Sequence, residues 1–246
     1  MVLLPRPNGI IRNIGFGAGG TTMEAGWWKK GLAEMLGAFG LVTVGAGSVL
    51  ANNGDLVFAA LAHASVIFVM GTALGPISGG QISPAVTLGL IVTRRVKADL
   101  GAVIIAFQLL GSILGGFLLA WLYPTQVLSG FRLATPAVAP SISPGQAAFV
   151  ELLMTFLLVF VVFATAIDPR GTVKTLGALP IGMTVGIDWF FGGALTGAAM
   201  SPGRWLGPAI ASGFFDNAWV YWVGPLLGGV LGALVYAHVF LPKEAR

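Results

Sequence analysis

The sequence contains no cysteine, only two histidines and few charged residues. Without cysteine the chain can form no disulfide, thiol nucleophile or cysteine-based metal site. Charged residues make up 9% of the chain, whereas soluble domains contain roughly 25%, so a water-exposed globular domain is excluded. His63 and His238 lie far apart, and no cluster of ligating side chains accompanies either. We therefore expect no cofactor, no metal site and no enzyme activity.

Long apolar segments dominate what is present, since 56% of the residues are hydrophobic. Six segments approach the roughly 20 residues that a helix needs to cross the hydrocarbon core. The predicted spans are Leu32–Leu50, Val57–Leu74, Leu100–Leu122, Phe149–Ile167, Leu176–Leu195 and Ala218–Leu241. The 37 glycines suit close contact between helices in lipid. These features predict an all-α integral membrane protein.

Basic residues gather on one side of this six-span arrangement. They precede the first span, separate the second from the third and the fourth from the fifth, and end the chain. They are Arg6, Arg12, Lys29, Lys30, Arg94, Arg95, Lys97, Arg170, Lys174, Lys243 and Arg246. The positive-inside rule then predicts cytoplasmic termini, and we expect a multi-pass protein of the plasma (cytoplasmic) membrane. The net charge of +4 reflects topology and does not indicate nucleic-acid binding.

The two halves of the chain resemble each other. "GLAEMLGAF" (Gly31–Phe39) is similar to "AFVELLMTF" (Ala148–Phe156), and "GSILGGFLLAWLY" (Gly111–Tyr123) is similar to "GPLLGGVLGALVY" (Gly224–Tyr236). Each half has three spans, so the second must be inverted in the membrane, which places special residues near the midplane. We predict one domain, 1–246, with a tail 1–30, repeats 31–122 and 147–241, an extracellular connection 123–146 and a C-terminal tail 242–246.

Two Ser-Pro pairs interrupt the apolar pattern at matched positions, Ser83 in "SGGQISPAVTLGL" and Ser201 in "LTGAAMSPGRWLGPAI". Serine is a favoured helix N-cap and proline a favoured first helical residue. Each pair therefore predicts a short re-entrant helix, from Pro84 to about Thr93 and from Pro202 to about Ser212. A kink in an ordinary span is the alternative, but the matched repeat positions favour half-helices. Inversion would bring their N-terminal dipole ends together as a barrier to cations.

Both stretches resemble the signature motifs of the aquaporin (major intrinsic protein) family, S-G-x-H-x-N-P-A-V-T-x-G and T-G-x-x-x-N-P-A-R-S-x-G-P-A. The resemblance extends to "WVGPLLGGVLGALVY" and to two glutamates within spans, and it covers nearly the whole chain. It implies six transmembrane helices plus two re-entrant half-helices. It also implies a homotetramer in the lipid bilayer, with one pore in each subunit and passive transport.

The chain departs from these motifs at the pore centre. The matching residues are Pro84, Ala85 and Pro202, whereas the two family asparagines are Ser83 and Ser201, the second alanine is Gly203, and a family histidine is Gln81. A serine hydroxyl can accept a backbone N–H and donate its own proton, so capping and donation to water can both persist. We expect a wider centre that orients water more weakly.

The family's outer constriction, transferred by its offsets from the motifs, falls on His63, Trp189, Ala198 and Arg204. An arginine at this depth must face water or a carbonyl cage, although a salt bridge between subunits is an alternative for Arg204. A packed, hydrogen-bonded side chain is the alternative for His63. Trp189 is equally compatible with a packing or interfacial role, and a register shift of one residue would place Asp188 at the pore instead.

Several polar residues in the spans have roles that the resemblance leaves less defined. Asp188 either lies at the membrane interface or pairs with Arg204, which would weaken the cation barrier. Glu34 and Glu151 are expected to bind the loop backbone that leads into the half-helices. We assign the same structural role to Gln108 in the third span.

These observations predict a passive channel for water, with ammonia and hydrogen peroxide as candidate further solutes. Trp205 replaces an aspartate of the family's glycerol-conducting branch and argues against a wide polyol pore, whereas His63 resembles the broader-specificity branch. An ion- or proton-leaky channel is one alternative, because both central asparagines are missing. A closed structural or adhesive membrane protein of the same fold is the other.

Overall fold

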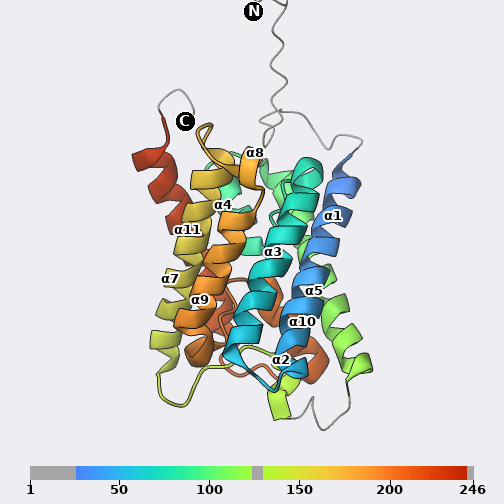
Figure 1. Cartoon of the computed structure of the whole chain (residues 1–246). Helices are drawn as coiled ribbons and strands as arrows, with labels where there is room; N and C mark the ends of the chain where they lie inside the picture. The colour runs from blue at the N-terminus through green and yellow to red at the C-terminus, as the bar shows by residue number, and fades with distance from the viewer. Residues whose placement is uncertain (1–25, 124–129, 243–246) are drawn as a thin grey trace, which may run out of the picture.

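The computed structural model describes residues 26–123 and 130–242, and every regular element within them is a helix (Figure 1). The first span is α1 (Trp27–Gly40), which continues through the π-helical turn η1 (Leu41–Ala46) into α2 (Gly47–Ala51). Helix α1 includes the last four residues of the predicted tail, 1–30. Residues 1–25 of that tail, and 243–246 of the C-terminal one, lie outside the described residues.

Five further helices complete the bundle. They are α3 (Leu56–Ser78), α5 (Ala98–Leu122), α7 (Pro144–Val162) with η3 (Phe163–Ile167), α9 (Leu179–Thr196), and α11 (Ala218–Val235) with η4 (Tyr236–Phe240). Five of the spans in the described residues are long and apolar enough to cross a membrane, and α9 is not among them. Its 18 residues still extend about 27 Å, and it packs between α3 and α7.

Two of the span boundaries that differ from the hydropathy prediction have a clear local cause. The fifth span begins at Leu179, because Gly177 adopts φ 57° and separates it from the short helix α8 (Val173–Leu176). Helix α7 begins five residues before Phe149, inside the predicted connection. There Ser143 and Gln146 form a capping box with Pro144 as the first helical residue. Both signals are local turn chemistry, which a hydropathy average does not detect.

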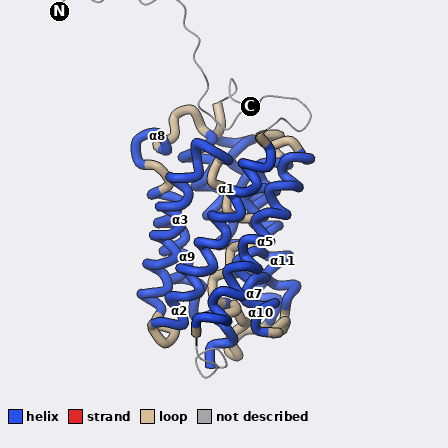
Figure 2. Tube along the Cα trace, turned by 90° about the vertical axis from the view of Figure 1, so that its right-hand side faces the viewer, coloured by secondary structure: helices blue, strands red, loops and turns tan. Residues whose placement is uncertain are grey.

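The two Ser-Pro pairs begin short helices, α4 (Pro84–Val92) and α10 (Pro202–Ser212). Figure 1 shows α4 toward the end of the bundle where α1 begins and α10 toward the opposite end. Their N-termini meet: a Cβ atom added to Gly203 would lie 3.7 Å from Cδ of Pro84. The prediction of inverted half-helices is confirmed, and kinked continuous spans are excluded. The loops that precede both helices run inside the bundle (Figure 2).

Each half-helix packs against the third span of the opposite half. Helix α10 contacts α5 and α4 contacts α11, in both cases at the second glycine of a Gly-Gly pair. A Cβ atom on Gly116 would collide with the carbonyl oxygen of Gly207, and one on Gly229 would lie 2.6 Å from the carbonyl oxygen of Ala85. Glycine permits this backbone-to-backbone approach, so the two halves are interlocked through their half-helices.

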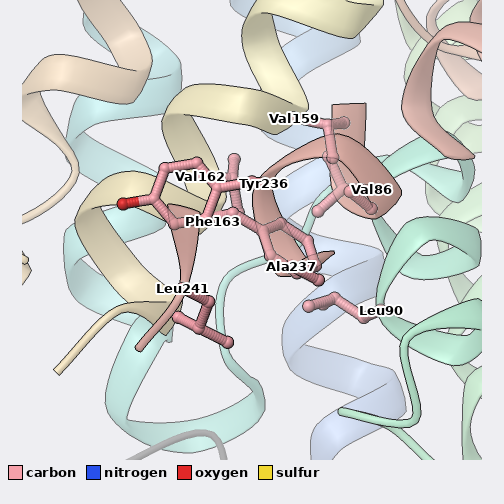
Figure 3. Packing of buried hydrophobic residues seen from close by; sticks show 9 residues of the cluster. Val86, Leu90, Val159, Val162, Phe163, Tyr236, Ala237 and Leu241 are labelled. Carbon is pink, nitrogen blue, oxygen red and sulfur yellow. The ribbon is translucent and has the colours of Figure 1, made fainter. Parts of the chain in front are cut away.

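An apolar cluster packs against α4 (Figure 3). It joins α4 to the ends of the fourth and sixth spans through Val86, Leu90, Val159, Val162, Phe163, Tyr236, Ala237 and Leu241. Phe163 and Leu90 are fully buried, and burying a side chain of this size contributes about 1.5–3 kcal/mol. The half-helix is therefore anchored by its own apolar residues as well as by its cap.

Asp168 links the same two spans by polar contacts. Its carboxylate accepts hydrogen bonds from Nε and Nη2 of Arg170, at 2.9 and 2.6 Å, and from the Tyr236 hydroxyl at 2.9 Å. Arg170 Nη2 also donates to the Phe240 carbonyl oxygen at 3.0 Å. The Arg170 hydrogen bond, the largest cause, places the pKa of Asp168 well below its ordinary value. Arg170 is 64% exposed, so solvent screens part of this stabilisation.

We expect Asp168→Asn to make stability less dependent on pH in the acidic range. The folded pKa of Asp168 is lowered, so its contribution is complete above the unfolded carboxyl pKa of about 3.9 and is lost as pH falls toward the folded pKa. The thermal midpoint of the variant in detergent should lie below that of the wild type at pH 7. The difference should narrow from about pH 4 downward. Asp216→Asn, at an exposed carboxyl, is the control, and a difference that widens in acid would contradict the assignment.

Candidate functional site

A buried carboxylate fixes the loop that leads into α4. Glu34, on α1, has no exposed surface, and Oε1 accepts hydrogen bonds from Ser78 Oγ at 2.6 Å and from the backbone N–H of Gln81 at 2.9 Å. Its Oε2 accepts from the backbone N–H of Ile82 at 2.6 Å and from Gln108 Nε2 at 2.8 Å. Both oxygens are therefore fully engaged, as a carboxylate buried in a membrane span requires.

The second half repeats this arrangement at Glu151 on α7. Oε1 accepts hydrogen bonds from Thr196 Oγ1 at 2.7 Å and from the backbone N–H of Ala199 at 2.9 Å. Oε2 accepts from the backbone N–H of Met200 at 2.7 Å. The two glutamates at matched positions of the sequence repeat therefore have the same structural role, since each binds the loop before a half-helix.

These loops contain strained backbone at residues whose N–H groups the glutamates bind. Ile82 adopts φ 61° and Met200 φ 51°, although neither is glycine. A non-glycine residue in the left-handed region costs about 1–3 kcal/mol, and the N–H of each strained residue is bound by a glutamate. The strain turns the chain sharply, so that Ser83 and Ser201 directly follow with extended backbone as the helix caps.

The two serines are buried and cap the half-helices where the N-termini of these helices meet. Ser83 Oγ accepts the N–H of Ala85 at 3.3 Å, and Ser201 Oγ accepts the N–H of Arg204 at 3.5 Å. Both distances exceed the usual range of about 2.7–3.2 Å for an N–H···O hydrogen bond. Among the described residues neither hydroxyl donates a hydrogen bond. Each hydroxyl proton is therefore available to a molecule between the half-helices.

Arg204 and His63 come together in the interior of the bundle. Arg204 is 1% exposed, and its Nε donates to His63 Nε2 at 2.9 Å while its Nη1 donates to the Ala134 carbonyl oxygen at 3.1 Å. Because Nε2 accepts, the hydrogen-bond pattern assigns the ring proton to Nδ1, which donates to the Ala59 carbonyl oxygen at 2.7 Å.

The family offsets also point to Trp189 and Ala198. Trp189 lies beside His63, and Ala198 lies in the loop before the Ser201 cap. The ring of Trp189 lies 4.4 Å from that of His63, centroid to centroid, and is tilted by 34°. Ala198 has no exposed surface and adopts φ 41° in the loop before Ser201. The structure therefore brings His63, Trp189 and Arg204 together and places Ala198 in the strained segment that leads to Arg204.

The connection between the halves supplies a contact that the sequence did not indicate. Arg132, Leu133 and Ala134, which form the short helix η2, adopt φ 49°, 54° and 54°. This left-handed turn directs the Ala134 carbonyl oxygen at Arg204. None of the three residues is glycine or asparagine, so no local signal predicts the turn.

Asp188 takes a different position from Trp189. It is 1% exposed, and its Oδ2 has no hydrogen-bond partner among the described residues. Arg204 donates to His63 and Ala134 instead, so pairing with Arg204, one of the two alternatives for Asp188, is absent. Gly192, one turn along α9, packs against Met154 of α7. Residues four apart share a helix face, so Asp188 lies on the side of α9 that faces α7.

The fold and this site define a membrane channel built from two inverted repeats. Residues 21–236 match the major intrinsic protein family. The chain is 40% identical to "Aquaporin TIP4-4" of Zea mays over 89% of this chain and 90% of that protein. It is 38% identical to "Aquaporin-4" of Bos taurus over 88% of this chain and 68% of that protein.

A solved structure is also similar, the aquaglyceroporin from Plasmodium falciparum, with a TM-score of 0.74, 26% identity, and coverage of 87% of this chain and 96% of that one. The chain belongs to the major intrinsic protein family. It is therefore a multi-pass membrane channel rather than an enzyme, as the sequence predicted.

We expect Glu34→Gln to destabilise the fold by about 1–3 kcal/mol, the cost of a buried group left unsatisfied. A glutamine would replace one acceptor oxygen with an NH₂ group that faces hydrogen-bond donors. Thermal unfolding in detergent measures the effect. Asp55→Asn is the matched control, because this exposed residue caps α3 and asparagine is an equally good cap. Equal losses in both variants would contradict the proposed role of Glu34.

Proposed function

We propose that this protein is a passive channel for water, with one pore in each subunit. The centre is formed by Ser83, Pro84, Ala85, Ser201, Pro202 and Gly203, and the outer constriction by His63, Trp189, Ala198 and Arg204. The observation that supports this most is the meeting of two capped half-helices whose hydroxyl protons bind no described residue. Water passing between them can accept a hydrogen bond from each serine in turn.

The charge distribution along this path disfavours cations. The N-terminal ends of α4 and α10 converge at the centre, and each adds about half a positive charge. Arg204 adds a full charge near the constriction, and only its Nε and Nη1 donate to described residues. The guanidinium has five N–H donors, so the others can bind the oxygen of a passing molecule. The converging dipoles do not depend on asparagine and remain with serine caps.

The aromatic residues near Arg204 bear on the size of the solute. Trp205 is 1% exposed and stacks on Tyr221 at 5.7 Å with 9° between the rings, so it is part of the packing rather than the pore wall. Trp189 and His63 are adjacent and would narrow the constriction. We therefore propose water as the main solute, with ammonia and hydrogen peroxide as further candidates because both are small and neutral.

We also propose the assembly and the orientation. Large apolar side chains are exposed on the outer faces of α3 and α9, with Phe58 at 55% and Phe190 at 54%. These surfaces must meet lipid or other subunits, and we propose a homotetramer. The first and last spans begin and end at the same end of the bundle, where α8, which contains Lys174, also lies (Figure 1). We propose that this end is cytoplasmic and that the membrane is the plasma membrane.

Proteoliposomes that contain the purified protein should shrink or swell in an osmotic gradient faster than empty vesicles of the same lipid and size. Stopped-flow light scattering measures the rate. A rate equal to that of empty vesicles would exclude the water channel and would favour the closed structural protein of the same fold. Ionic current in planar bilayers would instead favour the ion-leaky alternative.

We expect Ser83→Asn with Ser201→Asn to lower proton leak while water permeability stays within the same order. Asparagine adds one donor and reaches further at each cap, so water would be oriented more strongly. Vesicles with an internal pH dye measure proton leak alongside swelling. Ser141→Asn, a hydroxyl-to-amide change at an exposed position in the turn before α7, controls for reconstitution. An unchanged leak would show that the serines are equivalent to the family's asparagines.

A further inference from the structure

We propose that Gly45, in the π-helical turn of the first span, positions His63 and is a fifth determinant of the outer constriction. This inference rests on the proposed function, because it concerns the residues that line the constriction. None of the motif offsets points to the first span. The turn itself, η1, is the irregular segment between α1 and α2, and π-helical turns are frequent at functional sites.

The edge of the His63 ring lies directly on the Gly45 backbone. A Cβ atom added to Gly45 would lie 2.5 Å from Nε2, 2.6 Å from Cδ2 and 3.0 Å from Cε1 of the imidazole. The nearest of these atoms, Nε2, is the one that accepts the hydrogen bond from Arg204. Any side chain at Gly45 would therefore displace the atom on which the position of Arg204 depends.

The imidazole has no free direction in which to move. Nδ1 is bound to the Ala59 carbonyl oxygen at 2.7 Å, Trp189 packs on the ring at 4.4 Å, and Arg204 Nε lies 2.9 Å from Nε2. A ring pushed away from the first span must give up at least one of these contacts. Because the first span lies on one side and Trp189 and Arg204 on the others, it would move into the constriction.

The first span cannot move away instead. Val42 and Ala46, on either side of Gly45, are fully buried and belong to a cluster with Leu119 of α5 and Leu133 of the connecting turn. Moving η1 outward would open this cluster, and cores resist changes of even one methylene. Gly45 is thus fixed by its neighbours, and its missing side chain provides the space that His63 occupies.

The test is Gly45→Ala in proteoliposomes, with water and ammonia permeability measured in the same preparation. We expect a several-fold fall in water permeability and a changed water-to-ammonia ratio, because the displaced ring narrows the opening and releases Arg204. Gly40→Ala is the matched control in the same span, since its Cβ would lie 3.5 Å from Met70 at an ordinary contact distance. That variant should conduct like the wild type.

A double-mutant cycle separates a clash with His63 from general damage to the span. With His63→Ala the ring is absent, so adding Gly45→Ala should change neither permeability further, a non-additive result. If the Gly45→Ala protein fails to reconstitute, the double variant is decisive. A double variant that reconstitutes, because His63→Ala removes the clash, supports the inference. A double variant that also fails to reconstitute contradicts it. The inference is also contradicted if the wild type conducts water and Gly45→Ala leaves both the water and the ammonia permeability unchanged. A wild type that conducts no water overturns the proposed function instead.

Discussion

The rest of the structure depends on two buried carboxylates that bind backbone inside the membrane. A loop at membrane depth leaves N–H groups without partners, and each costs several kcal/mol in hydrocarbon. Glu34 and Glu151 accept those N–H groups at Gln81, Ile82, Ala199 and Met200. With the loops fixed, the half-helices begin at defined depths, and their interlocking with α5 and α11 follows from where they begin.

The position of the proposed outer constriction depends on one of these loops. Arg204 lies three residues after Ser201, so the loop bound by Glu151 determines where its backbone enters the bundle. Its guanidinium is then oriented by His63 from α3 and by Ala134 from the connecting turn η2. Segments from both halves and from the connection between them therefore meet at one side chain. Such a site is rigid because its parts belong to elements that are packed independently.

The sequence predicted those parts of the fold that depend on local chemistry. Serine favours the N-cap and proline the first helical position, so the starts of α4 and α10 could be predicted from the Ser-Pro pairs at Ser83 and Ser201. The matched glutamates could be interpreted because the chain repeats itself. The predicted start of the fifth span, Leu176, was wrong because a hydropathy average does not detect the φ angle of Gly177, which separates α8 from α9. The turn at Ala134 and the contact of Gly45 with His63 depend on neighbours distant in sequence, so no local pattern reveals them.

Where the two half-helices meet, the chain differs from the family motifs at three neighbouring positions, Ser83, Ser201 and Gly203. Serine replaces asparagine at both caps, which creates space, and Gly203 stands where the family motif has alanine. A Cβ atom at Gly203 would lie 2.9 Å from Ser112 Oγ, so a hydroxyl occupies room that a methyl group would need. Ser112 donates to the Gln108 carbonyl oxygen, and Gln108 Nε2 donates to Glu34. Gln108 Nε2 also donates to Thr87 Oγ1 at 3.1 Å, and Thr87 Oγ1 donates to the Ser83 carbonyl oxygen at 3.2 Å, so polar contacts link the first cap to the carboxylate that fixes its loop.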